Sequence, residues 1–202
     1  MGTSNAKLTE KDIRMAAARL QVDTAALKAV LAVEASGSGF MEDGRVKVNY
    51  EPHQMYRQLK KNFSKQRADD EWAKHPDLIS RVPGHRRSLD QEDKDMDRAT
   101  LIDRHSALES ASWGLPQIMG YHWKALGMSG IQEFVNMMYK GEAGQLDVMV
   151  RFIEIDPALH LALRRHDWNS FARIYNGPNY AAGSYHTKLQ KAYAKAYAEE
   201  QR

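Results

Sequence analysis

The order of apolar and polar residues along the chain predicts helices over most of its length. In residues 24–35 only Lys28 and Glu34 are charged, so a helix here would be apolar nearly all round and therefore buried. Asp23, directly before this segment, is a favourable N-cap residue. Residues 185–201 are rich in alanine and lysine and place apolar residues at helical spacing, which predicts a closing helix.

Residues typical of helix N-termini mark the starts of further helices. Thr9 with Asp12 resembles a capping box before a helix that reaches about Leu20. Four more starts are indicated by Ser88 with Gln91, by Ser129 with Gln132, by Asp156 before Pro157, and by Asp167. These signals predict a long polar helix towards Glu109 and shorter helices over residues 134–139, after residue 156 and up to residue 174.

Evidence for strands is confined to residues 45–50, where Val46, Val48 and Tyr50 alternate with other residues and would share one face. Residues 76–87 contain Pro83-Gly84, which indicates an irregular loop. The sequence therefore predicts a mainly α (α+β) fold, a single domain with one minor β element.

Composition excludes several classes of site. The chain of 202 residues suits one domain, and it has no cysteine, which excludes a disulfide framework, a thiol nucleophile and a cysteine-based zinc site. His105 and Glu109 stand four positions apart on a predicted helix and could in principle bind a cation. A simple surface pair is the expected arrangement, so we predict no metal and no cofactor.

The charge is mildly basic, +3 at neutral pH, and unevenly distributed. Five basic residues and no acidic one lie between Arg57 and Arg67, and five acidic residues with one lysine lie between Asp90 and Asp97. A basic face would attract an anionic polymer such as cell wall, anionic lipid or nucleic acid. Each run alone is expected to be a solvated face.

The candidate for acid catalysis is Glu34. It ends the apolar segment and precedes a Ser/Gly-rich turn, residues 36–39. Apolar neighbours and the negative end of a helix dipole both disfavour the carboxylate, so both raise the pKa. A raised pKa is what a carboxyl group needs to donate a proton near neutral pH. The alternative is a solvated glutamate at a helix end.

Three segments mix aromatic residues, amides and glycines: residues 49–53, 109–120 and 171–180. Such mixtures suit sugar binding, because rings stack on apolar sugar faces and amides bond hydroxyl groups. Each segment taken singly could instead be a turn with core aromatics.

Together these segments resemble the phage-type N-acetylmuramidase domain found in endolysins of phages that infect Gram-negative bacteria. That domain is distantly similar to goose-type lysozymes and soluble lytic transglycosylases. The motifs are a helix ending in Glu34 with a Ser/Gly turn, Gly-x-x-Gln-Ile-Met at 114–119 and Ala-x-x-Tyr-Asn-Gly at 172–177. Glu51 with His53, and the run 109–114, also match. The resemblance extends from about Leu8 to Ala198.

The resemblance implies a lysozyme-like fold, peptidoglycan as substrate and a role for each matching residue. Glu34 would be the general acid, with Tyr175 and Asn176 beside it and Gln117 on the sugar. Glu51 and His53 would be a second polar group, and Ser112, Trp113 and Tyr180 would contact substrate. Glu109 would hold the turn at 112–114 through backbone amides. The sequence departs from the family at Pro52 and at Leu115-Pro116, and Pro116 puts local strand pairing in doubt because it lacks a backbone donor.

The reaction implied is cleavage of the β-1,4 bond between N-acetylmuramic acid and N-acetylglucosamine. Glycosidases generally use two carboxyl groups, and Glu51 is the first candidate for the second one, followed by Asp43. If neither reaches the site, the N-acetyl group of the substrate could act as nucleophile and give the 1,6-anhydro product of a lytic transglycosylase. A domain that binds peptidoglycan or membrane without cleaving it remains the alternative class.

Residues 1–7 are expected to be a flexible N-terminus or a cloning remnant, and residues 8–202 the muramidase catalytic domain. Residues 1–10 carry no signal peptide. We therefore expect synthesis in the host bacterial cytoplasm and action on the wall in the periplasm. A monomer that binds no nucleic acid is expected. Lys188, Lys191 and Lys195 beside Tyr193 and Tyr197 could bring the C-terminal helix to the anionic outer membrane; an ordinary packed helix is the alternative.

Overall fold

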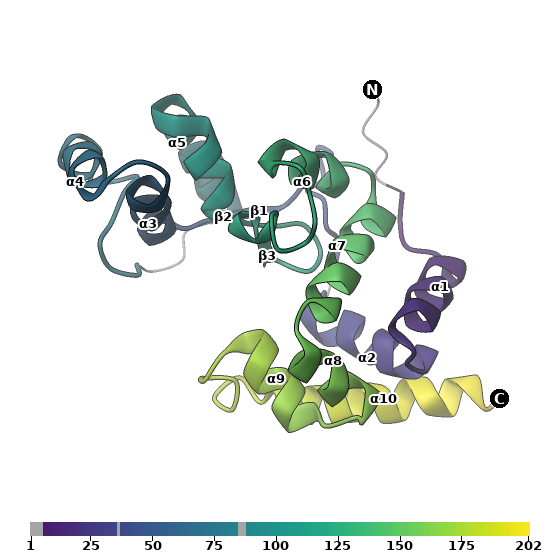
Figure 1. The fold of residues 1–202 in the computed structure, drawn as a ribbon. Coiled ribbons are helices and arrows are strands. Elements are labelled where there is room, and N and C mark those ends of the chain that lie inside the picture. The colour runs from purple at the N-terminus through teal and green to yellow at the C-terminus, as the bar shows by residue number, and fades with distance from the viewer. Residues whose placement is uncertain (1–5, 36, 85–87) are drawn as a thin grey trace.

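The computed structural model describes residues 6–35, 37–84 and 88–202, which form mainly helices (Figure 1). Their elements in chain order are α1 (Glu10–Leu20), α2 (Thr24–Glu34), β1 (Val48–Tyr50), α3 (Pro52–Asn62), α4 (Lys65–Lys74), α5 (Leu89–Glu109), β2 (Ala111–Trp113), β3 (Ile118–Met119), η1 (Gly120–His122), α6 (Ile131–Met138), α7 (Glu142–Glu154), α8 (Pro157–Arg164), α9 (Trp168–Asn176) and α10 (Tyr185–Glu200). The predicted mainly α fold with a small sheet is confirmed.

Side-chain caps start most of the helices that the sequence predicts. Thr9 and Asp12 form the expected reciprocal capping box of α1, and Asp23 accepts a hydrogen bond from the Ala26 amide at the start of α2. Ser88 and Asp167 cap α5 and α9 in the same way. Each cap satisfies an amide that the first helical turn leaves without a partner.

Two helix predictions differ from the structure. Helix α6 begins at Ile131 after Gly130, because the side chain of Ser129 bonds the Glu133 carboxylate and does not cap the helix. Helix α5 is kinked at Asp103, whose φ of −156° and ψ of 109° are not helical. The Asp103 carboxylate accepts a hydrogen bond from the Ser106 amide, so it caps the second part of the helix.

The three strands form one antiparallel sheet in the order β1-β2-β3. Val46, Val48 and Tyr50 are all buried, as their shared face predicted. Pairing of Ser112 with Met119 and of Trp113 with Ile118 leaves Pro116 in the turn between β2 and β3. The proline therefore removes no donor from the ladder, and the doubt that it raised about strand pairing is resolved.

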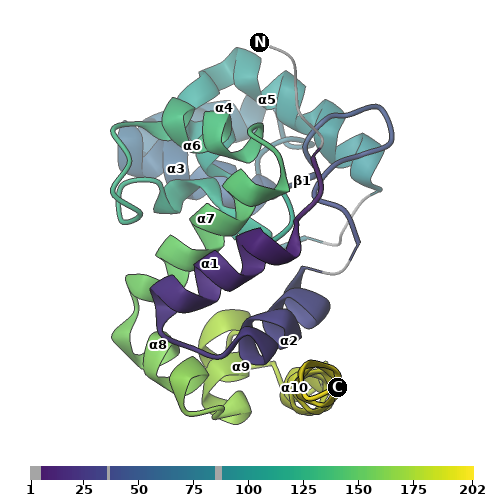
Figure 2. The same ribbon diagram turned by 90° about the vertical axis from the view of Figure 1, so that its right-hand side faces the viewer.

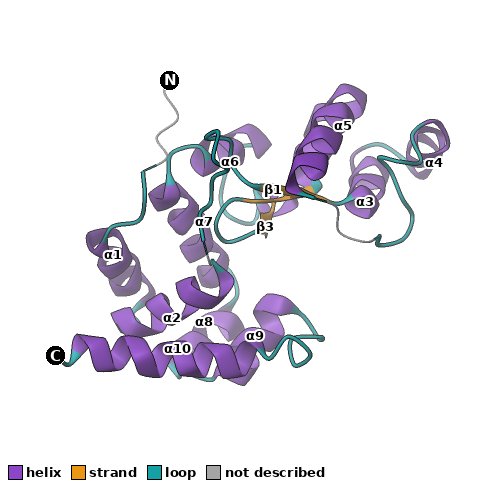
Figure 3. Cartoon of the chain, turned by 180° about the vertical axis from the view of Figure 1, so that it is seen from behind, coloured by secondary structure: helices purple, strands orange, loops and turns teal. Residues whose placement is uncertain are grey.

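The helices form two groups, and the sheet lies with one of them. Helices α1, α2, α8, α9 and α10 lie in the lower part of Figure 1, and α3, α4 and α5 lie with the sheet in its upper left. Helix α7 runs from one group to the other (Figure 2), and the view from behind shows the strands between α5 and α7 (Figure 3). Helix α10 packs along α2, so the helix that carries Glu34 is enclosed by the C-terminal segment.

The acidic run is not the solvated face that we expected. Glu92, Asp93 and Asp95 are buried, with exposed fractions of 4%, 6% and 1%. Arg45 pairs with Asp93, and the Gln91 amide donates to Asp95. Buried carboxylates require such partners, so this run is part of the internal packing of α5 against the segment before β1.

Of the predicted N-terminal segment, residues 1–5 lie outside the described part, as do residues 85–87 of the predicted loop. Ala6 accepts a hydrogen bond from the Glu142 amide, and the Lys7 ammonium group pairs with the Glu142 carboxylate. Among the described helices, none is both long and apolar enough to cross a bilayer.

Candidate active site

Glu34 is the last residue of α2, and the last turn of this helix is less buried than the turns before it. Ala26, Leu27 and Val30 are fully buried, whereas Leu31 and Val33 in the last turn are only half-buried and Ala32 is exposed. The half-buried carboxyl group of Glu34 therefore lies at the border between an apolar interior and an open surface. A proton donor needs such a place, because its environment is apolar while the substrate can still reach it.

The environment of Glu34 favours its protonated form. Burial raises the pKa of Glu34, while a hydrogen bond from Asn176 and the positive charge of Lys188 act against this rise without cancelling it. The Asn176 amide donates from Nδ2 to Glu34 Oε1 at 2.8 Å. Because an N–H group pairs with an oxygen that carries no hydrogen, the proton of the acid form belongs on Oε2.

Tyr175 lies close to Glu34, as predicted from the motif. The negative charge of Glu34 adds to burial in raising the pKa of Tyr175, so this hydroxyl stays protonated. It donates to the backbone carbonyl of Pro116 at 3.2 Å. The ring of Tyr175 stacks on Phe171 and meets Phe152 edge to face. Tyr175 therefore links the end of α9 to the turn between β2 and β3.

Gln117 is held at the end of that turn by two hydrogen bonds. Its Oε1 accepts from the Ser112 hydroxyl at 3.1 Å, and its Nε2 donates to the Gly114 carbonyl at 2.8 Å. Its backbone is left-handed, with φ of 50°. Ser112 is 4% exposed. The Ser112 hydroxyl thus orients Gln117, and its direct contact with substrate stays a prediction.

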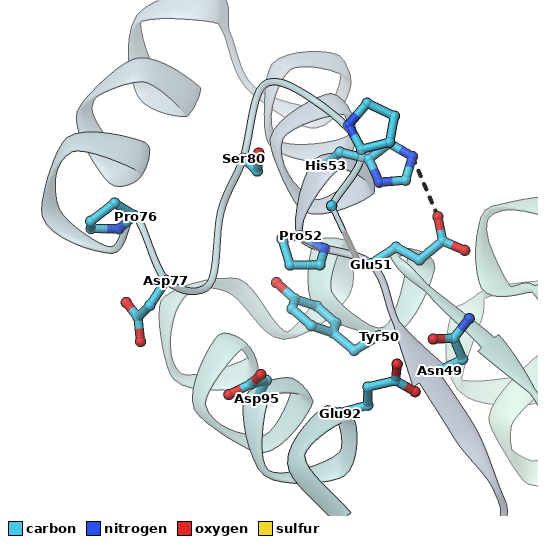
Figure 4. A pocket seen from close by; sticks show the side chains of 12 residues that line it. Asn49, Tyr50, Glu51, Pro52, His53, Pro76, Asp77, Ser80, Glu92 and Asp95 are labelled. Atoms are coloured by element: carbon cyan, nitrogen blue, oxygen red, sulfur yellow. Dashed lines mark ion pairs between the residues drawn. The ribbon is translucent and has the colours of Figure 1, made fainter. Parts of the chain in front are cut away.

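Glu51 and His53 line a recess whose lining does not include Glu34. They line a cavity of about 630 Å³ at the end of β1, together with Asn49, Asp77, Ser80 and Glu92 among others (Figure 4). Glu51 Oε2 and His53 Nε2 are 3.3 Å apart. Burial, with a smaller contribution from Arg57, lowers the pKa of His53. Among the described residues, no hydrogen bond or ion pair joins Glu51 or His53 to Glu34.

Asp43 and Glu109 are both engaged elsewhere. Asp43 is exposed and binds the guanidinium group of Arg45 at 2.7 and 2.8 Å, which lowers the pKa of Asp43. Glu109 is 1% exposed and accepts from the Trp123 indole at 2.7 Å and the Asn62 amide at 2.8 Å. Glu109 thus has a structural role, but through these side chains and not through backbone amides.

The two remaining aromatic candidates differ. Trp113 is 1% exposed, donates from its indole to the Leu108 carbonyl and meets Phe134 edge to face. Its ring is thus part of the core, and its contact with sugar is a prediction that this burial does not support. Tyr180 is half-buried on the segment between α9 and α10 and packs against His186. Its contact with substrate stays a prediction.

Sequence reasoning did not assign Lys188 to the site. It was noticed only as part of a basic stripe on the C-terminal helix, yet its charge acts on Glu34. Its ammonium group lies 5.3 Å from the centre of the Tyr185 ring. The sequence holds no signal for this, because the proximity arises from the packing of α10 along α2. Within the described part of the chain, no group of three or more His, Cys, Asp or Glu residues could hold a metal ion.

Comparison with known proteins agrees with this geometry. The sequence model of the N-acetylmuramidase family matches residues 23–197. The fold is similar to the crystal structure of the Burkholderia AP3 phage endolysin, with 41% sequence identity, a TM-score of 0.90, and coverage of 98% of this chain and 74% of that chain. None of the curated protein sequences matches the chain. The resemblance found in the motifs is thus confirmed, and the chain belongs to the N-acetylmuramidase family.

Proposed function

We propose that the protein is a peptidoglycan hydrolase that cleaves the β-1,4 bond between N-acetylmuramic acid and N-acetylglucosamine, with Glu34 as general acid. The observation that carries this proposal is the position of Glu34 at the open end of a buried helix, where burial raises its pKa. Membership of the N-acetylmuramidase family supports the same reaction and substrate.

The acid step uses the free oxygen of Glu34. With Oε1 bonded by Asn176, the proton on Oε2 is available for the glycosidic oxygen. Tyr175 is fixed by the Pro116 carbonyl and packs beside the acid, and Gln117 presents its amide from the opposite hairpin. Proton donation as the bond to the leaving sugar breaks is the contribution expected of such a carboxyl group.

The second step is completed by water at the anomeric carbon. Retaining and inverting glycosidases place their two carboxyl groups roughly 5–5.5 Å or 6.5–9.5 Å apart. Asp43 is held by Arg45, and Glu51 Oε2 lies 3.3 Å from His53 Nε2. Glu51 is the candidate for the second carboxylate, and the substrate's N-acetyl group is the competing nucleophile, which would give a 1,6-anhydro product.

Mass spectrometry of fragments released from purified peptidoglycan tests this proposal. We expect reducing muramic-acid ends from the wild-type protein, none from Glu34→Gln, and retained activity in Asp43→Asn as a carboxylate control. Products lighter by one water would mean a transglycosylase on the same scaffold. Absence of fragments from a folded wild type that still sediments with peptidoglycan would leave a binding domain.

We further propose that the protein acts as a monomer in the periplasm and that its C-terminal helix contacts the anionic outer membrane. Lys188, Lys191 and Lys195 are exposed on one side of α10, and Tyr197 is 48% exposed. Co-sedimentation with vesicles that contain anionic lipid, compared with Lys191→Glu/Lys195→Glu, tests the membrane contact. Equal binding of both proteins would refute it.

A further inference from the structure

One buried amide, the side chain of Gln145 on α7, lies between two segments of the site. Gln145 is 0% exposed, and Leu146, Val148 and Met149 around it in α7 are also buried. Its Oε1 accepts from the Leu115 amide at 2.7 Å, and its Nε2 donates to the Met138 carbonyl at 3.0 Å. Leu115 belongs to the turn between β2 and β3, so the amide ties this turn to the interior.

Two glycines approach the same side chain. A Cβ atom added at Gly39 would lie 1.8 Å from Gln145 Oε1, and one added at Gly114 would lie 2.7 Å from Gln145 Cδ. Real Cβ atoms are essentially never found at such distances, so a side chain at either position would require Gln145 to shift. Gly39 stands five positions after Glu34, and Gly114 stands three positions before Gln117. The side chain of Gln145 therefore lies between the segment that follows Glu34 and the turn that carries Gln117.

Both segments are fixed on their other sides. Gly39 donates its amide to Glu142 Oε1 at 3.3 Å and accepts at its carbonyl from the Lys47 amide at 2.9 Å. The turn accepts the Tyr175 hydroxyl at Pro116. Gln145 is therefore the contact that the two anchored segments share, and its volume limits how closely they approach each other.

We propose that Gln145 is a positioning residue, a spacer that sets the separation between Glu34 and the wall formed by Gln117 and Tyr175. This inference rests on the proposed function of the same site. Gln145 touches no substrate and acts through the two segments packed on it. Catalysis is sensitive to such spacing, since a misplacement of about 1 Å can cost on the order of 100-fold in rate.

The first test is Gln145→Ala, with Gln58→Ala as the matched control. Gln58 is also a buried glutamine, 6% exposed, but lies on α3 away from these segments. With soluble glycan strands as substrate, we expect kcat to fall about 10- to 100-fold in Gln145→Ala with KM little changed. Gln58→Ala is expected to lower Tm while keeping kcat. A fall in Tm alone for both variants would overturn the proposal.

The second test measures coupling between Gly39 and Gln145. The backbone of Gly39 lies outside the left-handed region, and the three nearest atoms that the Cβ of Gly39→Ala would meet all belong to Gln145. We expect Gly39→Ala to lower kcat strongly in the wild-type background and only slightly in Gln145→Ala, where the clash is absent. Equal losses in both backgrounds would refute the spacer role.

A measurement that does not depend on turnover can test this inference separately from the proposed function. In Gln145→Ala, movement of the segment after the acid should let water reach Glu34, so an NMR titration should show the pKa of Glu34 falling towards its ordinary value. Gln58→Ala should not change it. A wild type that releases no fragments would refute the hydrolase function. An unchanged pKa of Glu34 in Gln145→Ala, together with equal kcat losses from Gly39→Ala in both backgrounds, would refute the role of Gln145 alone.

Discussion

The acidity of Glu34 depends on opposing influences on one carboxyl group. Burial raises its pKa, and the Asn176 amide and the Lys188 ammonium group stabilise the carboxylate and lower it. The net rise keeps the proton on the group at higher pH, as a general acid requires. The same hydrogen bond from Asn176 fixes which oxygen carries that proton. Acidity and orientation are therefore set by different neighbours and can be changed separately.

Replacement of Lys188 by methionine tests the effect of its positive charge on the pKa of Glu34. Removing a positive charge that favours the carboxylate raises the pKa of Glu34 further, so the acid stays protonated to higher pH. We therefore predict that the alkaline limb of the kcat profile moves to higher pH in Lys188→Met. The control is Lys191→Met, one turn further along α10, which should leave the profile unchanged. A shift to lower pH would contradict this account.

Replacement of the acid itself should stabilise the fold. Because the pKa of Glu34 is raised in the folded state, the stability linked to this group is full below its unfolded pKa and is lost as the pH rises through the folded pKa. Glu34→Gln cannot ionise and avoids that loss. We predict about 0.5–2 kcal/mol of added stability near neutral pH, as is common where active sites trade stability for function. Thermal melts at neutral and acidic pH should show this gain shrinking in acid, and a loss of stability at neutral pH would refute it.

The sequence could identify those residues whose environment is formed by their neighbours in the chain. Glu34 could be identified because the apolar residues that bury it precede it directly in the chain. Trp113 could not be separated from a sugar-binding ring, because residue type alone does not tell whether a ring faces the cleft or the core. The effect of Lys188 on Glu34 could not be predicted for a related reason, since the two residues lie far apart in the sequence.

At the scale of elements, α7 connects the parts of the site. Its first residue, Glu142, is 4% exposed and binds the Lys7 ammonium group, the Leu8 amide, and Ser38 and Gly39 after the acid. Burial alone would raise the pKa of Glu142, but these donors outweigh burial and the pKa is lowered. One turn later Gln145 contacts the hairpin. The start of α7 thus joins the N-terminal segment, the segment after the acid and the hairpin.

We predict that Glu142→Gln destabilises the protein by about 1.5–3 kcal/mol at neutral pH, the usual contribution of hydrogen bonds to a charged group. A lowered folded pKa contributes stability above the unfolded pKa, and this contribution is lost as the pH falls through the folded value. The difference between wild type and variant in denaturant titrations should therefore shrink in acid. Glu199→Gln, an exposed carboxylate near the end of α10, is the control. If the stability difference between wild type and Glu142→Gln stayed the same at low pH, the charge of Glu142 would not be its cause.

Helices with a clear starting signal were predicted, and others were not. Thr9, Asp23 and Asp167 cap their helices as expected. Helices α3 and α7 follow Glu51 and Gly141, neither of which caps its helix with a side chain. Only the first-turn proline Pro52 marks the start of α3. Helix α4 has a capping serine, but its residues are mostly polar, so no apolar stripe indicated a helix.

At the scale of the whole molecule, the site is assembled from segments far apart in the chain. The acid comes from α2, Asn176 and Tyr175 from α9, and Gln117 from the hairpin after α5. The order of the motifs indicated that these residues act together, whereas their separations follow only from packing. This is why the sequence could propose Glu51 as a second carboxylate but could not foresee the recess that Glu51 lines with His53.

The packing of α10 leads to a prediction about the complete fold. Leu189 and Ala196 are buried, and α10 lies along the helix that ends in Glu34. Deletion of residues 185–202 would uncover the apolar face of α2, and losing several buried side chains of about 1.5–3 kcal/mol each would exceed most of a typical domain's stability. We therefore predict that this deletion abolishes cooperative thermal unfolding and fragment release together.

A shorter deletion provides the control for that experiment. Removing residues 199–202 breaks the pair between Lys28 and Glu200, 3.4 Å apart and partly exposed, and surface pairs contribute only about 0–1 kcal/mol. This variant should melt cooperatively within a few degrees of the wild type and keep its activity. If the long deletion still melted cooperatively and cleaved isolated peptidoglycan but no longer acted on intact cells, α10 would serve the membrane and not the fold. The burial of its apolar face against α2 argues for the fold.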